Sequence, residues 1–472
     1  MAEKKAVNKV VEPTNEEIDA YVDQLVSKAQ VALSKFEEFT QEQVDYIVAK
    51  CSVAGLDAHG TLAEAAINET GRGVFEDKAV KNLFACEYVT SNLRHLKTVG
   101  IINEDPLLGI TEIAEPVGVV CGIVPTTNPT STVIFKSLIC LKTRNPIIFS
   151  FHPSAHACSV MAAVVIRDAA VAAGAPEDCI QWLDMKSMYA TTALMKHPGV
   201  ATILATGGNA MVSAAYSCGK PALGVGAGNV PAYVEKTCVL PRAVNDIVLS
   251  KSFDNGMICA SEQAAIVDHE IYDDFMKEIK RFKVYFVNKD EKAKLEQFMF
   301  GAAAYSDNVN AAKLNPNVVG KPATWIAEQA GIKVPEDTQI ICAECAEVGP
   351  NEPLTREKLS PVLAILKASS TEDGILKSTQ MVEFNGLGHS AAIHTENHEL
   401  SKRFGHACKA IRIIENAPST FGGIGSVYNA FIPSLTLGCG SYGHNSVSNN
   451  VSAINLINIK RIGRRNNNMQ WV

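Results

Sequence analysis

The clearest candidate for chemistry in this sequence is Cys259. It lies in the run Phe-Asp-Asn-Gly-Met-Ile-Cys-Ala-Ser-Glu-Gln at residues 253–263. Gly256 and the small and polar residues around the cysteine are typical of a tight, exposed bend. A thiol on such a bend can act as a nucleophile, although free cysteines also serve as small buried apolar residues. The sequence has thirteen cysteines, and this local context is what distinguishes Cys259 from the others.

A second element could supply an amide donor to the same chemistry. Asn128 lies in the run Pro-Thr-Thr-Asn-Pro-Thr at residues 125–130, directly after a strand expected at 119–124. Asparagine before proline is common in turns, which is the simpler explanation of the motif. A thiol nucleophile together with an amide that stabilises an oxyanion would, however, suit chemistry at a carbonyl carbon.

A Gly-rich turn follows another expected strand. Thr206, Gly207 and Gly208 stand between a strand expected at 201–205 and a helix expected at 210–217. Backbone N–H groups at the start of such a helix can hold a phosphate, and a tight strand-to-helix turn without a ligand has the same pattern.

Two further motifs carry less weight. The run Gly-Val-Gly-Ala-Gly-Asn at 224–229 resembles a dinucleotide fingerprint, but its third glycine is one position early and a strand is expected at 230–234. We therefore do not interpret it as a standard Rossmann turn. Cys342 and Cys345 form one C-x-x-C motif without a second pair, so we expect no metal site.

The bulk composition restricts the class of protein. A chain of 472 residues with 47% apolar and 20% charged residues predicts a globular protein of two or more domains. The net charge of −7 argues against partners such as nucleic acid or an anionic membrane. The unpatterned cysteines and the polar start, without a secretory signal, favour a cytoplasmic location, with a bacterial microcompartment as the alternative.

The order of expected elements predicts an α/β fold. Capping boxes at Thr14 and Thr40 open two helices, and a hairpin is expected at 98–119 with an edge that could pair with another subunit. Strands and helices then alternate, which implies parallel βαβ units. The expected domains are 1–230 with the hairpin, 231–425 with Cys259, and a C-terminal return at 426–472 that contains a late strand at 454–462.

Taken in order, these elements resemble the aldehyde dehydrogenase superfamily. Three motifs carry the resemblance: residues 123–132, residues 253–263, and Pro-Ser-Leu-Thr-Leu-Gly-Cys-Gly-Ser at 433–441. More narrowly, the chain looks like the CoA-acylating branch, above all the aldehyde dehydrogenase half of bifunctional aldehyde–alcohol dehydrogenases, from about residue 40 to 465. The resemblance implies a Rossmann-type cofactor domain, an α/β catalytic domain and a small β element for oligomerisation.

The resemblance also implies roles for individual residues. Cys259 matches the family's nucleophile, and Asn128 matches the amide that shares the oxyanion with the Cys259 N–H. Glu357 matches the carboxylate that holds the nicotinamide ribose. His389 falls where the acylating branch carries a catalytic histidine beside the nicotinamide. The remaining matches are positions that contact the cofactor: Thr206, Gly207, Gly208, Gly226, His152 and Pro153.

Two departures from the family pattern are informative. Hydrolytic members carry a glutamate base in the segment that corresponds to 224–229, but this chain has no Asp or Glu from Met211 to Val234. Water needs a base to attack a thioester whereas a thiol is far more acidic, so the difference favours coenzyme A over water. Many relatives also have Lys-Pro-Ser-Glu where this chain has His-Pro-Ser-Ala at 152–155. Without that carboxylate, NADP stays open beside NAD.

The expected reaction is the reversible conversion of a short-chain aldehyde, CoA and NAD to acyl-CoA and NADH through a thioester on Cys259. Acetaldehyde is favoured, with propionaldehyde and succinate semialdehyde as alternatives. A hydrolytic enzyme would need a substitute base such as Glu262. A cysteine hydrolase and a non-catalytic filament or shell subunit remain alternatives from other classes. We expect a homodimer or larger homo-oligomer, and an iron-dependent alcohol dehydrogenase as a fused or separate partner.

Overall fold

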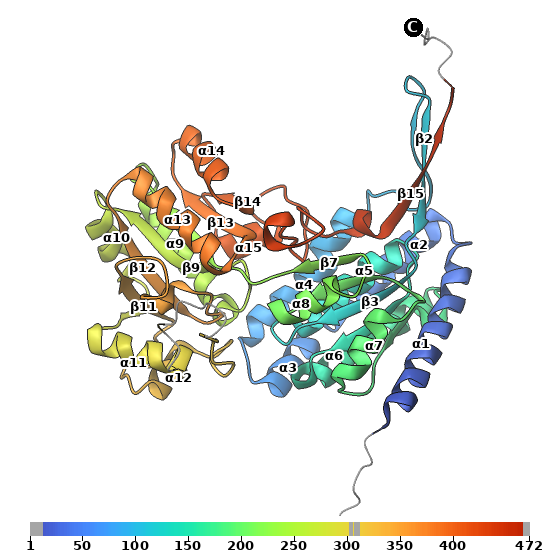
Figure 1. Cartoon of the computed structure of the whole chain (residues 1–472), viewed down its shortest axis with the longest axis horizontal. Helices are drawn as coiled ribbons and strands as arrows, with labels where there is room; N and C mark the ends of the chain where they lie inside the picture. Colours follow the sequence, from blue (N-terminus) through green and yellow to red (C-terminus); the bar gives the residue numbers. More distant parts are fainter. Residues whose placement is uncertain (1–12, 302–304, 306–311, 466–472) are drawn as a thin grey trace, which may run out of the picture.

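The structure consists of two α/β units and a projecting three-stranded sheet (Figure 1). It is a computed structural model that describes residues 13–301, 305 and 312–465. The two α/β units lie side by side, and the sheet projects from the unit that contains the N-terminal helices. This confirms the expected α/β class and the small β element.

Four helices precede the first sheet. The capping boxes expected at Thr14 and Thr40 are present, because each threonine hydroxyl accepts from the backbone three residues on and the side chain there accepts from the threonine N–H. The helices α2 and α4 pack against each other and against α5, the first helix of the α/β unit. The four helices are α1 (Asn15–Phe36), α2 (Gln41–Asp57), α3 (His59–Thr70) and α4 (Phe75–Leu93).

The first unit contains a five-stranded parallel sheet with the order β5-β4-β3-β6-β7. The chain runs outward from β3 in one direction and then from β6 in the other, so the crevice where such sheets bind ligands lies at the carboxyl ends of β3 and β6. The strands are β3 (Val119–Val124), β4 (Ile147–Phe151), β5 (Ile180–Trp182), β6 (Val200–Thr206) and β7 (Ala222–Val225), and the helices are α5 (Pro129–Lys142), α6 (His156–Ala172), α7 (Met188–Lys196) and α8 (Asn209–Tyr216).

The second unit contains a seven-stranded parallel sheet with the order β10-β11-β12-β9-β8-β13-β14. Apolar clusters lie on both of its faces. The strands are β8 (Val230–Val234), β9 (Glu262–Asp268), β10 (Val284–Phe286), β11 (Ile340–Cys345), β12 (Val362–Ala368), β13 (Gly388–His394) and β14 (Ala410–Glu415), and the helices are α9 (Leu240–Ser252), α10 (Tyr272–Ile279), α11 (Lys289–Phe300), α12 (Ala323–Gln329), α13 (Thr371–Asn385), α14 (His398–Ala407) and α15 (Ser419–Ile424).

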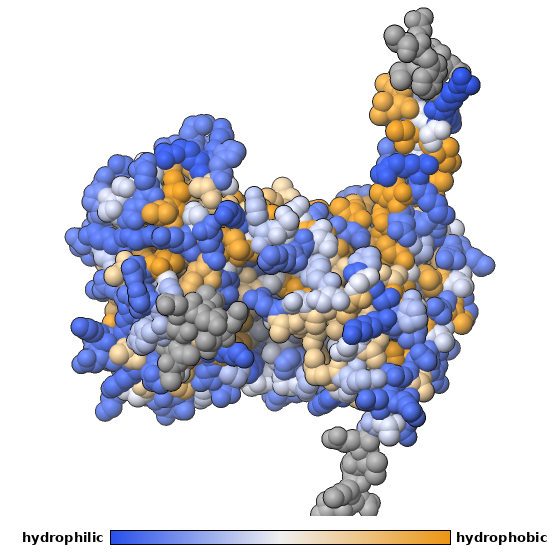
Figure 2. Space-filling view, in the orientation of Figure 1, coloured by the Kyte–Doolittle hydropathy of each residue, from blue (hydrophilic) through white to orange (hydrophobic). Residues whose placement is uncertain are grey.

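The projecting sheet joins the expected hairpin to the expected late strand. Strands β1 (Gly100–Asp105) and β2 (Ile110–Pro116) form the hairpin, and β15 (Ile457–Gly463) pairs antiparallel with β2. The hairpin tip carries Leu107 and Leu108, with exposed fractions of 95% and 69%. Figure 2 shows apolar side chains along this arm. We call β1, β2 and β15 together the arm.

One helical stretch, Pro153–Ala172, is long and apolar enough to cross a membrane by length and composition alone. In this structure its main helix, α6, packs against α2, α3 and α5. The packing accounts for its apolar residues as those of a helix that covers the first sheet.

A glycine on α13 generates a prediction about stability. A Cβ at Gly374 would lie 2.3 Å from the Tyr233 ring on β8, whereas a Cβ at Gly405 on α14 would meet Ile413 at 3.7 Å, an ordinary contact. Gly374→Ala should therefore destabilise the protein by about 1–3 kcal/mol through overpacking. Gly405→Ala should leave it unchanged or stabilise it by up to about 1 kcal/mol. Calorimetric unfolding of both variants checks this, and equal midpoints would contradict it.

Candidate active site

The candidate site lies between the carboxyl edge of the first sheet and the amino edge of the second. Asn128 follows β3 and the turn at 206–208 follows β6, whereas Cys259 precedes β9 and Glu357 precedes β12. The apolar residues on either side of Cys259, Ile258 and Ala260, belong to the same buried cluster as side chains of α4, α5 and β3. The loop that carries the thiol is therefore packed into the first unit.

The backbone before Cys259 makes an unusually tight turn. Asp254, Asn255 and Gly256 have φ values of 48°, 52° and 69° in succession, which is the left-handed region. A Cβ at Gly256 would lie 2.7 Å from the Ser360 carbonyl oxygen, so glycine is required there. Cys259 is half-buried at the end of this turn. The expected tight bend is present, but Cys259 is half-buried on it rather than exposed.

Asn128 is held by a lysine that sequence reasoning missed. It is the N-cap residue of α5 and is half-buried. Its Oδ1 accepts from Lys81 Nζ on α4 at 2.6 Å, and its Nδ2 donates to Thr127 Oγ1 at 3.3 Å. Burial lowers the pKa of Lys81 to about 8, with Asp254 acting in the opposite direction. Lys81 is thus still an ammonium at neutral pH.

The other half of the site converges on Gly228. Its N–H donates to Glu357 Oε1 at 2.8 Å. A Cβ at this position would lie 2.0 Å from the Cys259 carbonyl oxygen and 3.1 Å from the His389 ring. The structure therefore brings together Cys259, His389 and Glu357, as the resemblance implies. The segment 224–229 is confirmed not to be a Rossmann turn, because it leads from β7 directly into β8.

His389 is fully buried at the start of β13 rather than exposed on a loop. Its Nδ1 lies 3.1 Å from Ser390 Oγ, and its Nε2 has no hydrogen-bond partner among the described residues. Burial and the nearby Arg412 hold the pKa of His389 well below its ordinary value. The ring is therefore neutral at physiological pH and has one nitrogen available.

The charges around Cys259 oppose one another. Burial, together with the charges of Glu357 and Cys439, raises the pKa of the Cys259 thiol to about 12, and Arg412 acts in the opposite direction. The Arg412 guanidinium is buried, and its acceptors are the uncharged oxygens of His389, Leu437, Gly438, Ser390 and Asn450. Its positive charge therefore remains available to favour a thiolate. Nothing in the local sequence indicated Arg412.

Glu357 and Glu262, the two glutamates that the sequence analysis considered near Cys259, have different surroundings. Burial raises the pKa of Glu357 to about 7, and the Gly228 N–H opposes the shift. Burial also raises the pKa of Glu262 to about 7, but Glu262 is fully buried at the start of β9. Its Oε1 accepts from the Ser419 N–H at 2.8 Å, which directs it toward α15. Glu357, not Glu262, is the carboxylate whose charge acts on Cys259.

The expected cofactor turn follows β6. Thr206 is buried and its hydroxyl lies 2.9 Å from Thr436 Oγ1, while Gly208 is the N-cap residue of α8. A Cβ at Gly208 would meet nothing within 4 Å, and one at Gly207 would meet only Met211 at 3.7 Å. This open turn at the crevice of the first sheet has room for a phosphate group and suits one.

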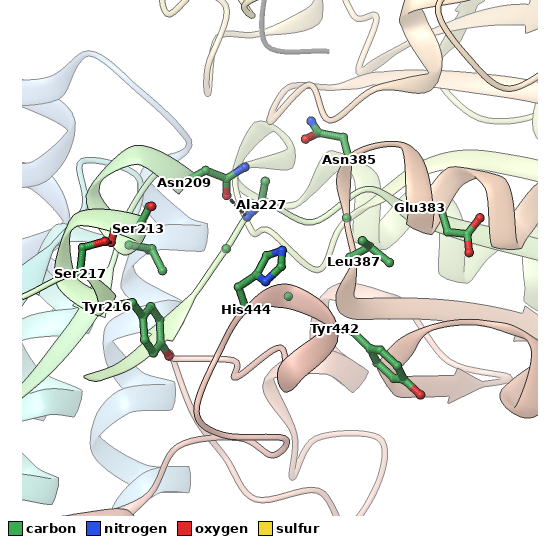
Figure 3. A pocket seen from close by; sticks show the side chains of 14 residues that line it. Asn209, Ser213, Tyr216, Ser217, Ala227, Glu383, Asn385, Leu387, Tyr442 and His444 are labelled. Atoms are coloured by element: carbon green, nitrogen blue, oxygen red, sulfur yellow. Dashed lines mark hydrogen bonds between the residues drawn. The ribbon is translucent and has the colours of Figure 1, made fainter. Parts of the chain in front are cut away.

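A cavity of about 430 Å³ is lined by Asn209, which directly follows this turn, and by Gly226 and Ala227, which precede Gly228. It lies between α8, the end of α13 and the C-terminal segment (Figure 3). Asn209 Oδ1 accepts from the Ala227 N–H at 2.8 Å and closes one wall. Gly226 lines the cavity; His152 and Pro153 do not, and lie exposed after β4 at the same edge of the sheet. Tyr442 and His444 form the opposite wall and were not predicted.

The remaining thiols do not form a metal centre. Cys342 and Cys345 are buried on β11. Within residues 13–301, 305 and 312–465, no group of three or more His, Cys, Asp or Glu residues is arranged to hold a metal ion. All thirteen cysteines are unpaired.

Comparisons with known proteins agree with this architecture. The model of the Aldehyde dehydrogenase family matches residues 2–426. The aldehyde-alcohol dehydrogenase of Streptococcus pneumoniae serotype 4 is 70% identical over 474 residues, which is 100% of this chain and 53% of that protein. The bifunctional enzyme AdhE of Escherichia coli K12 is 46% identical, over 96% of this chain and 50% of its own length.

A solved structure shows the same fold at full length. The acetylating aldehyde dehydrogenase from Geobacillus thermoglucosidasius superposes with a TM-score of 0.93 at 43% identity, covering 98% of this chain and 100% of that one. The chain spans about half the length of the curated aldehyde-alcohol dehydrogenases it matches. The family resemblance and the fold expected from the sequence are both confirmed. The chain belongs to the aldehyde dehydrogenase family.

Proposed function

We propose that this chain is a CoA-acylating aldehyde dehydrogenase. It converts a short-chain aldehyde, CoA and NAD reversibly to acyl-CoA, NADH and a proton, with acetaldehyde as the favoured aldehyde. One observation carries the proposal: the segment 224–229 passes against Cys259 and His389 at Gly228, and it contains no carboxylate. Water attack on a thioester there would lack its usual base, whereas a thiol needs less help.

Several relatives support this choice of chemistry. A propionaldehyde dehydrogenase of Rhodopseudomonas palustris, 27% identical with a TM-score of 0.82, has been solved with CoA and an acylated cysteine. A succinate-semialdehyde dehydrogenase (acetylating) of Clostridium kluyveri is 36% identical over 94% of this chain. Propionaldehyde and succinate semialdehyde therefore remain the alternative substrates. An engineered glycolyl-CoA reductase, 27% identical, carries NADP⁺, so NADP stays beside NAD as the cofactor.

In the mechanism, Cys259 reacts as the thiolate that Arg412 favours, formed when the thiol loses its proton to solvent, and its sulfur attacks the aldehyde carbonyl carbon to give a tetrahedral hemithioacetal anion. The oxyanion accepts hydrogen bonds from the Asn128 amide and the Cys259 N–H. When bound, the nicotinamide dinucleotide would accept the hydride; Thr206, Gly207 and Gly208 would hold its phosphates and Glu357 its nicotinamide ribose. The loss of hydride leaves a thioester on Cys259.

Release of the acyl group needs a proton acceptor for the incoming thiol. His389 is neutral and buried, its ring lies against Gly228, and its Nε2 has no hydrogen-bond partner among the described residues, so Nε2 can accept this proton. Because the pKa of His389 is held well below its ordinary value, the ring passes the proton on to solvent rather than keeping it. Arg412 holds the ring neutral by its charge and carries a hydrogen bond to the His389 carbonyl at 2.7 Å. CoA then takes the acyl group and Cys259 leaves as a thiolate, which Arg412 favours.

The first test of the proposal is whether turnover depends on CoA. With acetaldehyde and NAD alone, stopped-flow absorbance at 340 nm should show one burst of NADH and then a near-stalled phase, because the segment 224–229 supplies no carboxylate to activate water. Addition of CoA should restart turnover. Omitting the aldehyde or NAD should abolish the signal.

Continued turnover without CoA would contradict the proposal and favour a hydrolytic enzyme. Glu262→Gln and Glu357→Gln would then identify the base, as these are the two buried carboxylates considered for that role. Hydrolysis of an ester without NAD would instead favour a cysteine hydrolase, and inactivity with every combination would favour a non-catalytic subunit.

The second prediction concerns the nucleophile. Cys259→Ala should remove NADH formation entirely while NAD still binds, because the thiol forms the covalent intermediate but no part of the phosphate turn. Cys342→Ala and Cys345→Ala should keep nearly full turnover, since both thiols are buried in β11. NADH formation and NAD binding by calorimetry check this. More than a trace of oxidation by Cys259→Ala would mean that another residue is the nucleophile.

The arm supports assembly with a second copy of the chain. It leaves β1 and β15 as open edges and exposes Leu107, Leu108 and Ile462 far from the two cores. Long open edges and exposed apolar residues favour strand pairing between chains. We therefore infer a homodimer or larger homo-oligomer that pairs through the arm. A fused or separate alcohol dehydrogenase and a cytoplasmic location remain part of the proposal.

The third prediction follows from the arm. The double variant Leu107→Glu, Leu108→Glu should have a smaller mass by light scattering than the wild type. The unfolding midpoint of the two α/β units should not change, because both leucines are exposed on the arm. Leu376→Glu, at a 54% exposed position on α13, is the matched control and should keep the wild-type mass. An unchanged mass for the arm variant would place the interface elsewhere.

A further inference from the structure

A buried ion cluster connects α4 to both catalytic loops. Lys78 and Lys81 lie three residues apart on one face of α4, each with an exposed fraction of 3%, and both pair with Asp254, which is fully buried. Asp254 belongs to the turn that leads to Cys259, and Lys81 also reaches Asn128. One ammonium group thus contacts an element of each half of the site.

The contact with Asn128 fixes which way its amide points. A lysine ammonium can only donate hydrogen bonds, so the atom that faces Lys81 must be the carbonyl oxygen Oδ1 and not the NH₂ group. The NH₂ group is left on the far side, where its observed contact is the longer one to Thr127 Oγ1. Without Lys81, the amide would be free to turn its oxygen toward the substrate, where it would repel an oxyanion.

Asp254 in turn fixes Lys81 and the nucleophile loop. Its Oδ1 accepts from the Val74 N–H at 2.8 Å, and its own N–H donates to Asp77 Oδ2 at 2.7 Å. A Cβ at Gly73 would lie 2.0 Å from Asp254 Oδ1, so the start of α4 fits closely around this carboxylate. The loop before Cys259 is therefore anchored to the helix that also holds Asn128.

We propose that Lys81 is a positioning residue for the oxyanion site. Lys81 orients the Asn128 amide so that the NH₂ donors face the substrate. Through Asp254, Lys81 also sets the distance between Asn128 and the loop that carries Cys259. This inference rests on the proposed function, because it assigns Lys81 to the reaction through the role of Asn128. Lys78 shares the ion pair with Asp254 but donates to the Thr127 carbonyl and not to the Asn128 side chain.

A double-mutant cycle in kcat tests the proposal. Asn128→Ala should lower kcat by about 10²–10³-fold with little change in KM, the usual loss for one oxyanion donor. Lys81→Met should lower kcat strongly, also with little change in KM. Because Lys81 acts through Asn128, the double variant should be no slower than Asn128→Ala alone. A double loss equal to the product of the single losses would overturn the proposal.

Two controls separate positioning from a loss of structure. Lys142→Met removes another buried lysine, at the C-terminal end of α5, which pairs with Asp45. Because Lys142 does not contact Asn128, any loss in kcat that it causes should multiply with the loss caused by Asn128→Ala. Lys81→Arg keeps a buried donor and should retain more activity than Lys81→Met. If Lys81→Met does not fold, the cycle is run with Lys81→Arg and Lys81→Gln, with the same criterion.

A crystal structure of a folded Lys81 variant provides a readout independent of the reaction. The Asn128 amide should be rotated or disordered relative to the wild type, while the fold is retained. An unchanged amide would overturn the proposal whatever reaction the enzyme performs. Conversely, a rotated amide in the Lys81 variant, together with a wild-type protein that forms no NADH with aldehyde, NAD and CoA, would uphold the positioning role and refute the proposed function.

Discussion

The arrangement of the site depends on the missing side chain at Gly228. The short connection from β7 to β8 crosses between the two sheets, and at this residue it passes against the Cys259 carbonyl, the His389 ring and the Glu357 carboxylate. A methyl group there would overlap the Cys259 carbonyl oxygen at 2.0 Å. The residues that approach one another come from two loops and the start of β13, and only a glycine at 228 leaves room for all three segments.

Burial gives this site its electrostatic character. Cys259, His389 and Glu357 are each shifted toward their neutral forms, because burial removes water from all three. Two positively charged residues lie next to the reacting groups: Lys81 donates a hydrogen bond to Asn128 Oδ1, and Arg412 donates one to the His389 carbonyl. A preorganised field of this kind favours charge that develops only during the reaction.

The sequence predicted the parts of this arrangement that lie at chain reversals. Cys259, Asn128 and the turn at 206–208 stand beside Gly or Pro and next to apolar strands, so their positions on turns followed from local pattern, and the family resemblance supplied Glu357 and His389. Lys81 was missed because it lies mid-helix without a local motif. The only signal was a pair of lysines three residues apart on a helix that also buries Phe84 and Val89.

Glu262 shows how little distance along the chain says about distance in space. It is three residues from Cys259 and was therefore the nearest candidate base for the hydrolytic alternative, but β9 begins at Glu262 and carries it into the core beside Ser419. Distance along the chain is a poor guide once a strand starts in between, because successive side chains then point to opposite faces. Arg412 and Tyr442 became neighbours of the site only through tertiary packing, which no local pattern encodes.

The pairing of β15 with β2 also constrains how the chain folds. The Asn458 side chain donates to the Pro116 carbonyl 342 residues earlier, and the Asn145 side chain donates to the Leu456 carbonyl across 311 residues. The first unit to leave a ribosome therefore cannot complete its arm, or cover the end of α5, until the entire second unit has been synthesised. Contacts of such long range slow folding and leave strand edges open in the meantime. For this chain, a strand translated after the second unit completes the sheet that projects from the first.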